Sequence, residues 1–139
     1  MPIEKEKEMT TEEETMPMPK EHWKEDPEEQ DYPAARSYLS LLVAPDEARK
    51  YAKALAREKG ISHYKAKDLL RASRLPLLPA DDPELTKDLE KVGKGIKLSP
   101  VLLVRGEPLW VADGYHRICA SYHIDEDASI PCRIVGRIS

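Results

Sequence analysis

Proline decides where this chain can be helical. Proline lacks a backbone N–H and its ring clashes with the preceding turn, so a helix accepts it in the first turn but not in the interior. Pro33 and Pro45 each precede a segment with apolar residues at helical spacing, and we expect one helix to begin at each of them. The three prolines within Arg74–Pro83 exclude a helix interior there and predict an extended edge segment.

The period of the apolar residues changes along the chain. In the first two thirds they recur at helical spacing, whereas the last third contains short apolar runs that predict buried strands. The fold class that we expect is therefore α+β, helical in the first half and a compact α+β unit in the second. In chain order we expect helices at 33–43, 46–60 and 63–73, a helix from 83 to 93 or 95, strands at 100–104 and 109–113, a helix at 114–124 and a closing strand at 130–136.

Charge is unevenly divided between the ends of the chain. Residues 1–30 carry 11 acidic and 4 basic side chains and no apolar period, which predicts a mostly disordered acidic tail. The remaining residues carry 15 acidic and 18 basic side chains. We therefore expect a tail at 1–30, a helical extension at 31–73 and a core at 74–139. Two alternatives stay open for Trp23: it anchors the end of the tail on the fold together with Tyr32, or it is exposed to solvent.

Composition excludes several classes of protein. The two cysteines, Cys119 and Cys132, are too few for a disulfide framework, and we expect both to be small buried apolar residues with reduced thiols. No apolar run approaches the roughly 20 residues of a membrane span, and the acidic N-terminal segment lacks the apolar region of a secretory signal. These features predict a cytoplasmic protein without a membrane partner.

The segment from Asp113 to Arg117 joins a predicted strand to a predicted helix. The first backbone N–H groups of a helix have no internal acceptors, and the helix dipole places partial positive charge there. Gly114 allows a ligand to approach the backbone of Tyr115, while His116 and Arg117 add side-chain donors. The sequence therefore predicts an anion site suited to phosphate, with Asp113 and His116 as candidate catalytic residues.

A purely structural role is the alternative for the same segment. In that interpretation Asp113 caps the helix, Gly114 makes the turn, and His116 and Arg117 are solvated. Asp113, His116 and His123 also offer three metal ligands, but histidines that bind metal from one helix more often stand four apart. Since no further ligand is evident, we predict no metal site.

A second region, residues 56–71, matches the spacing of a helix-turn-helix. A small residue, a turn glycine four positions later and apolar residues in the second helix fit that motif. Lys65, Lys67 and Arg71 of the second helix are then candidates for contact with a DNA backbone. The alternative is a plain helical hairpin with a solvated basic face. A DNA-associated regulator without enzymatic activity is therefore one alternative function, and an interaction module whose acidic tail binds a basic partner is another.

Residues from about 71 to 136 resemble the ParB/sulfiredoxin superfamily. The G-x-x-x-P-I-x-V strand of ParB-type domains is similar to Gly95 and Pro100–Val104, and their G-E-R-R-x-x-A helix start is similar to Gly114–Ala120. The G-G-C-H-R-Y helix start of sulfiredoxin resembles Asp113–Ile118, and its closing T-I-P-A-K-L-V strand resembles Ser129–Val135. The resemblance implies a core with a small mixed sheet.

The resemblance also implies a nucleotide-phosphate pocket, often used with Mg²⁺. By position, Gly114, His116 and Arg117 would hold the phosphates of a nucleoside triphosphate, and Asp113 would bind Mg²⁺ or activate a hydroxyl. The superfamily hosts kinases and nucleotidases, so phosphoryl transfer and nucleotide hydrolysis are both expected of such a fold. Sulfiredoxin activity is not expected, because Tyr115 stands where that family has its catalytic cysteine.

The preceding helix departs from the family as well. Three polar positions that contact the nucleotide in sulfiredoxin fall on Leu85, Asp88 and Val92. Lys87 and Lys91 are the neighbouring residues that can supply positive charge in their place.

Overall fold

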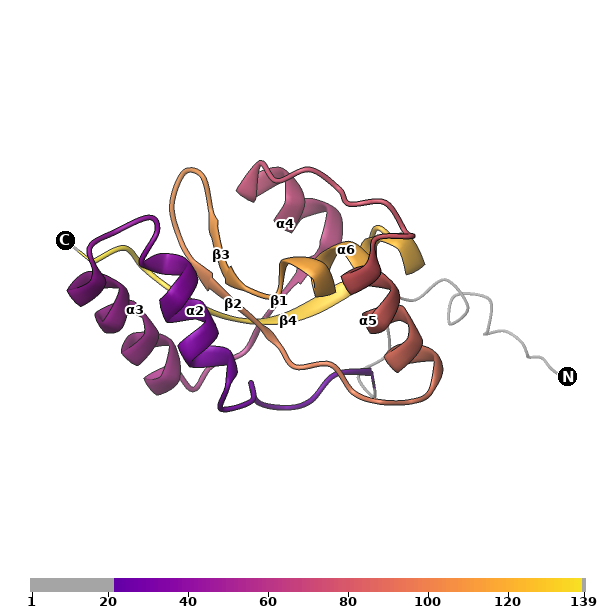
Figure 1. The fold of residues 1–139 in the computed structure, drawn as a ribbon, viewed down its shortest axis with the longest axis horizontal. Helices are drawn as coiled ribbons and strands as arrows, with labels where there is room; N and C mark the ends of the chain where they lie inside the picture. The colour runs from indigo at the N-terminus through magenta and orange to yellow at the C-terminus, as the bar shows by residue number, and fades with distance from the viewer. Residues whose placement is uncertain (1–21, 139) are drawn as a thin grey trace, which may run out of the picture.

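A four-stranded sheet runs through the centre of the molecule, with helices on both of its faces (Figure 1). This computed structural model describes residues 22–138. The strands are β1 (Ser62–Lys65), β2 (Val101–Val104), β3 (Trp110–Asp113) and β4 (Ser129–Val135), in the spatial order β1-β4-β2-β3. β4 is antiparallel to β1 and parallel to β2, and β3 is antiparallel to β2. The expected α+β class is confirmed, and the sheet is mixed.

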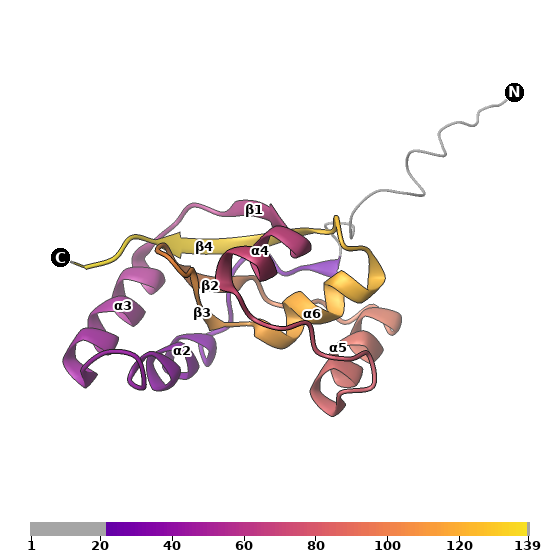
Figure 2. The ribbon, with the colours of Figure 1, turned by 90° about the horizontal axis from the view of Figure 1, so that it is seen from above.

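The helices form one layer on each face of the sheet (Figure 2). α2 (Asp31–Leu39) and α3 (Pro45–Arg57) pack on one face, while α4 (Ala66–Ser73) and α6 (Tyr115–Ile124) pack on the other. α5 (Pro83–Gly93) packs against α6. No helix between residues 22 and 138 is long and apolar enough to cross a membrane.

Strand β2 is buried on both of its faces. Successive side chains of a strand point to opposite sides, so Val101 and Leu103 join the apolar cluster below α4 and α6, while Leu102 and Val104 join the cluster below α2 and α3. All four side chains are fully buried. The wholly apolar run predicted a buried strand, and its side chains are divided between the two apolar clusters on either face of the sheet.

Most predicted helices begin where the local signals place them. α3 begins at Pro45, and α5 begins at Pro83 after Asp82. Asp82 Oδ1 accepts hydrogen bonds from the backbone N–H groups of Glu84 and Leu85 at 3.0 and 3.2 Å, which caps the helix. The strands and helix predicted in the last third are confirmed within a residue or two at each end.

Both cysteines are buried apolar residues, as predicted. Cys119 and Cys132 are free thiols with no exposed surface. Burial raises the pKa of the Cys132 thiol to about 12, so this side chain stays protonated at neutral pH.

The helix predicted at 63–73 is wrong in its first residues. Ser62–Lys65 forms β1, which pairs with β4 at the edge of the sheet, and α4 begins only at Ala66. The side chains of β1 alternate between half-buried and exposed, which is the period of a strand and not of a helix. The segment at 31–73 therefore contributes an edge strand to the main sheet as well as two layers of helix.

Residues 22–30, which we predicted to belong to a disordered tail, pack on the fold. Trp23 is 5% exposed. Its neighbours form a short bridge with Leu98, in which the Lys24 N–H donates to the Leu98 carbonyl at 2.7 Å and the Leu98 N–H donates to the His22 carbonyl at 2.9 Å. Trp23 is thus an anchor and is not exposed to solvent. The predicted tail does not extend to residue 30, and residues 1–21 lie outside the described part of the chain.

Tyr32 is a second anchor for this segment. Arg133, on the central strand β4, donates from Nη1 to the hydroxyl of Tyr32 at 3.0 Å and from Nη2 to Oδ1 of Asp26 at 2.9 Å. The side chain of Arg133 is almost fully buried, so its charge needs these partners.

The proline-rich segment at 74–82 is not an edge of the sheet. It contains no strand and crosses outside α6, linking α4 to α5 (Figure 1). The carbonyl of Pro76 accepts a hydrogen bond from the hydroxyl of Tyr115, and the carbonyl of Leu78 lies 2.7 Å from Nε2 of His123. Side chains of α6 therefore bind the segment, in place of a neighbouring strand.

Replacing Trp23 tests whether residues 22–30 belong to the folded unit. We expect Trp23→Ala to lower the free energy of unfolding by about 3 kcal/mol, because a large buried aromatic side chain is lost. The matched control is Tyr38→Ala, which removes an aromatic side chain that is 40% exposed and should cost much less. Urea denaturation followed by circular dichroism measures both. Equal, small losses for the two variants would contradict the packing of Trp23.

Candidate functional site

The predicted joint between strand and helix is present at Asp113–Tyr115. β3 ends at Asp113, α6 begins at Tyr115, and Gly114 lies between them with a φ of 111°. A Cβ on Gly114 would lie 2.8 Å from the Cβ of Val101 and 2.9 Å from Nη2 of Arg117. This glycine is therefore required by its backbone conformation and by close packing on β2. We predicted space for a ligand beside Gly114, but on the side that faces β2 this space is filled by the side chains of Val101 and Arg117.

Arg117 is held by the protein itself. Its Nη2 donates to Oδ2 of Asp113 at 3.1 Å and to the carbonyl of Pro100 at 3.3 Å. The two side chains of this ion pair are only 16% and 18% exposed. Nε of Arg117 is buried without an acceptor among residues 22–138. Arg117 thus connects β3, the start of β2 and α6, and only part of its guanidinium is free for an anion.

Asp113 lies close to a second carboxylate that sequence reasoning missed. Burial raises the pKa of Asp113, the charge of Arg117 opposes this shift, and the carboxylate of Asp31 adds to it. Asp31 is a buried residue at the start of α2, and its Oδ2 accepts a hydrogen bond from the N–H of Glu28 at 2.9 Å. No signal in the sequence joins positions 31 and 113, because α2 and β3 meet only through the tertiary fold.

Helix α5 brings a third carboxylate to the start of α6. Burial raises the pKa of Asp88, while the positive charges of Arg117, Lys91 and His116 oppose that shift. The charges of Arg117 and His116 reach Asp88 because α5 packs directly against α6, whereas Lys91 lies on α5 itself, one turn after Asp88. We call Asp88, Lys91, His116 and Arg117 the α5–α6 cluster. Two of its members, Asp88 and Lys91, are the residues that the sequence placed at or beside the family's nucleotide-contacting positions.

The start of α6 keeps free backbone donors. Gly114, the residue before the helix, makes no side-chain cap, and the first hydrogen bond onto it comes from the N–H of Ile118 at 3.0 Å. The N–H groups of Tyr115, His116 and Arg117 have no acceptor among residues 22–138. The hydroxyl of Tyr115 is used, since it donates to Pro76. What Tyr115 can offer a ligand is therefore its backbone N–H.

This arrangement suits an anion better than a bare metal ion. Three free N–H groups, the helix dipole and the positive side chains of the cluster favour negative charge at this point. Within residues 22–138, no three His, Cys, Asp or Glu side chains are grouped closely enough to hold a metal ion. A Mg²⁺ ion at Asp113 would therefore need ligands from a phosphate group, as is common for this ion.

The helix-turn-helix predicted at 56–71 is wrong in its geometry. Its two helices would have to be neighbours, but α3 ends at Arg57, β1 follows, and α4 lies on the opposite face of the sheet from α3. The spacing of small and apolar residues fits the motif, but β1 separates the two helices.

The candidate DNA-binding residues all have carboxylate partners. Lys65 and Lys67 lie 3.6 and 2.8 Å from Oδ1 of Asp127, and Arg71 lies 3.2 Å from Oδ1 of Asp68. These acidic neighbours reduce the positive potential that a DNA backbone would meet. DNA binding stays a prediction for which the geometry of this region offers no support.

Comparison of this chain with family models, with curated proteins and with solved structures found no match to any of the three.

Replacing Gly114 tests the packing at the joint. We expect Gly114→Ala to lower the free energy of unfolding by about 2–4 kcal/mol, because a Cβ is strained at this φ and meets Val101 and Arg117. The matched control is Gly93→Ala, since a Cβ at Gly93 meets no atom within 4 Å. Thermal or urea unfolding measures both variants. A Gly114→Ala protein as stable as the control would show that the backbone here can move away from β2.

The raised pKa of Asp88 predicts a pH-dependent effect of its replacement. The folded state binds the carboxyl proton more tightly than the unfolded state, so ionisation of Asp88 costs stability as the pH rises through the folded pKa. We expect Asp88→Asn to stabilise the protein at pH 7 and to have little effect below the usual carboxyl pKa of 3.8. Urea denaturation at pH 3.5 and 7 measures the difference. Glu90→Gln, on the exposed side of the same helix, is the control, and an equal response of the two variants would contradict the prediction.

Proposed function

We propose that the start of α6 binds a phosphate-containing ligand, with a nucleoside triphosphate as the first candidate. The observation that carries the proposal is the group of three backbone N–H donors at Tyr115, His116 and Arg117 that have no acceptor among residues 22–138. A phosphate has enough acceptor oxygens to accept from several such donors at once, and the helix dipole adds to its attraction.

The side chains around these donors have different roles in the proposal. His116 and Lys91 are the groups that contact the phosphate, because neither forms an ion pair with a carboxylate among residues 22–138 and both act electrostatically at Asp88. Arg117 acts mainly as a positioning residue, since its Nη2 already binds Asp113 and Pro100. Its Nε, which has no acceptor among residues 22–138, remains one further donor near the start of the helix.

The order of the elements supports membership of the ParB/sulfiredoxin superfamily, which is part of the proposal. A helix, a buried strand, a short hairpin, a helix start after glycine and a closing strand are expected of such a core, and α5, β2, β3, α6 and β4 follow in that order. Sulfinic acid reduction is not part of the proposed function, because Tyr115 stands where sulfiredoxin has its catalytic cysteine and its hydroxyl donates to the carbonyl of Pro76. The proposal places the protein in the cytoplasm, in keeping with its two free thiols.

The pKa values of Asp113 and Asp88 are both raised. Their carboxyl groups can therefore carry a proton nearer to neutral pH than an ordinary carboxyl group can. Phosphoryl transfer or nucleotide hydrolysis is the class of reaction that such groups would serve. Bound Mg²⁺ would neutralise charge on the phosphates, and Asp113 is the residue of this chain that would face it.

A ligand titration tests the proposal. Inorganic phosphate, ATP, CTP and GTP, with and without Mg²⁺, are added while thermal unfolding is followed. A ligand of the folded state at 100 times its Kd stabilises the protein by about 2.7 kcal/mol. We expect this rise with at least one ligand, and its loss in His116→Ala and in Lys91→Ala. Arg117→Ala is avoided, because it would break the ion pair with Asp113.

Lys94→Ala is the matched control, since Lys94 is an exposed lysine that follows α5 and is not part of the α5–α6 cluster. It should keep the full response. Failure of all these ligands to stabilise the wild type, or an equal loss in the Lys91 and Lys94 variants, would overturn the proposal. Release of inorganic phosphate in the samples with nucleotide and Mg²⁺ would add a hydrolytic activity to binding.

A further inference from the structure

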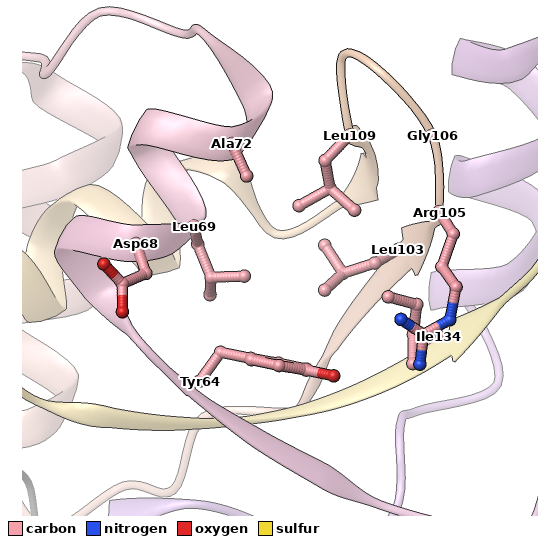
Figure 3. A pocket seen from close by; sticks show the side chains of 9 residues that line it. All are labelled: Tyr64, Asp68, Leu69, Ala72, Leu103, Arg105, Gly106, Leu109 and Ile134. Atoms are coloured by element: carbon pink, nitrogen blue, oxygen red, sulfur yellow. The ribbon is translucent and has the colours of Figure 1, made fainter.

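A concave region opens between α4 and the loop that joins β2 to β3. It is a cavity of about 300 Å³, which is the lower end of the range for small-molecule sites. Figure 3 shows that the side chains of Leu69, Leu103 and Leu109 point toward one another at its centre. All three are buried residues. The lining is completed on its apolar side by Tyr64, Ala72, Gly106 and Ile134.

Backbone hydrogen bonds hold the walls of this cavity in place. The N–H of Leu109 donates to the carbonyl of Ala72 at 3.0 Å, which ties the β2–β3 loop to the end of α4. The N–H of Arg105 donates to the carbonyl of Val135 at 2.8 Å, which extends the pairing of β2 with β4 beyond the strand. Since both walls are fixed to regular structure, the cavity is formed without a ligand, and binding would cost little ordering of the chain.

The charged groups of the cavity are arranged asymmetrically. Arg105 and the hydroxyl of Tyr64 lie on one side of the three leucines, and Asp68 lies on the other (Figure 3). Asp68 already accepts a hydrogen bond from Arg71 at 3.2 Å. Arg105 is an exposed residue and forms no ion pair with a carboxylate among residues 22–138, while Glu107, two positions further along the loop, pairs with Arg74 at 3.5 Å. One side of an apolar cavity therefore presents an unused cation.

This region is separate from the start of α6. Gly114 packs against Val101 at the beginning of β2, whereas the cavity contains Leu103 and the residues that follow the end of the same strand. Val101 and Arg105 are four residues apart along an extended backbone, which is about 13 Å. None of the residues of the α5–α6 cluster lines the cavity.

We propose that this cavity binds a small carboxylate with an apolar alkyl or aryl body. The apolar body lies on Leu69, Leu103 and Leu109, where the ligand's own hydrocarbon is removed from water. The carboxylate accepts two parallel hydrogen bonds from the planar guanidinium of Arg105, and the hydroxyl of Tyr64 is a further donor on that side. Asp68 repels a carboxylate from the other side, so the ligand has one favoured orientation.

The experiment compares two ligands of nearly the same shape. 3-Phenylpropionate and its neutral analogue 3-phenylpropionamide are titrated separately into the ¹⁵N-labelled protein, and backbone amide shifts are followed by NMR. We expect saturable shifts at Ala72, Gly106 and Leu109, with an affinity at least about tenfold higher for the carboxylate, because the amide has no negative charge and keeps only one oxygen that can accept from Arg105.

Three variants locate the interaction. Arg105→Gln should weaken binding of the carboxylate by about tenfold and weaken binding of the amide much less, because the amide makes no charge-charge interaction with Arg105. Arg57→Gln makes the same replacement at an exposed arginine that ends α3 on the opposite face of the sheet, and it should change neither affinity. Ala72→Trp places a large side chain over the cavity from an exposed helix position and should abolish binding of both ligands.

Four results would overturn the proposal. The first two are the absence of a saturable shift with either ligand and equal affinity of the wild type for both ligands. The third is the same loss of carboxylate affinity in the Arg105 and Arg57 variants, and the fourth is backbone amide shifts confined to Lys91 and His116. The last of these would assign the carboxylate to the start of α6 and would leave the phosphate proposal standing. Conversely, the expected result at the cavity does not depend on whether any nucleotide binds.

Discussion

Burial of β2 on both faces is the constraint on which the rest of this structure depends. A strand whose side chains are apolar on both sides needs cover on both sides. α2 and α3 cover Leu102 and Val104, while α4 and α6 cover Val101 and Leu103. The helices that precede the sheet in the sequence are therefore required by it, because without them one face of β2 would be exposed to water.

The same strand fixes the geometry at the start of α6. Val101 leaves room only for a glycine at position 114, and the carbonyl of Pro100 accepts from Arg117. Arg117 in turn binds Asp113, so the end of β3 and the first turn of α6 are joined by a partly buried ion pair. Breaking one partner of such a pair leaves an uncompensated charge. The sequence predicts that Arg117 binds a phosphate, but in the structure Arg117 joins β3, β2 and α6. A bound anion could therefore use only the part of its guanidinium that remains free.

Features encoded within a few residues could be predicted, and features that need a distant partner could not. The prolines at 45 and 83 and the apolar run at β2 each act locally, and the structure places them as expected. β1 has no apolar run, and it is a strand because β4 pairs with it from more than 60 residues away. Trp23 is buried because it meets the segment around Leu98, and nothing near position 23 indicates that contact.

The same distinction between local features and features that need a distant partner applies to the candidate site. The joint at Asp113–Arg117 was found from helix-end chemistry, which depends only on neighbouring residues. Asp31 was missed because it reaches Asp113 from α2. Arg105, which has no carboxylate partner among residues 22–138, was missed because the cavity beside it is built from α4, β1 and β4. Sequence reasoning also gave Arg117 to a ligand, whereas its nearest partners are an aspartate four residues earlier and a backbone carbonyl.

The position of β4 has a consequence for how the chain folds. β4 is the last of the four strands among residues 22–138, yet it lies inside the sheet, between the edge strand β1 and the buried strand β2. During synthesis β1 and β2 are therefore made before the strand that joins them, so until then β1 has no strand partner and β2 has one unpaired edge. Contacts of such long sequence separation slow folding, and open edges favour association with other chains. The nascent protein thus depends on late closure of its sheet, a stage at which a chaperone that shields strand edges would have its largest effect.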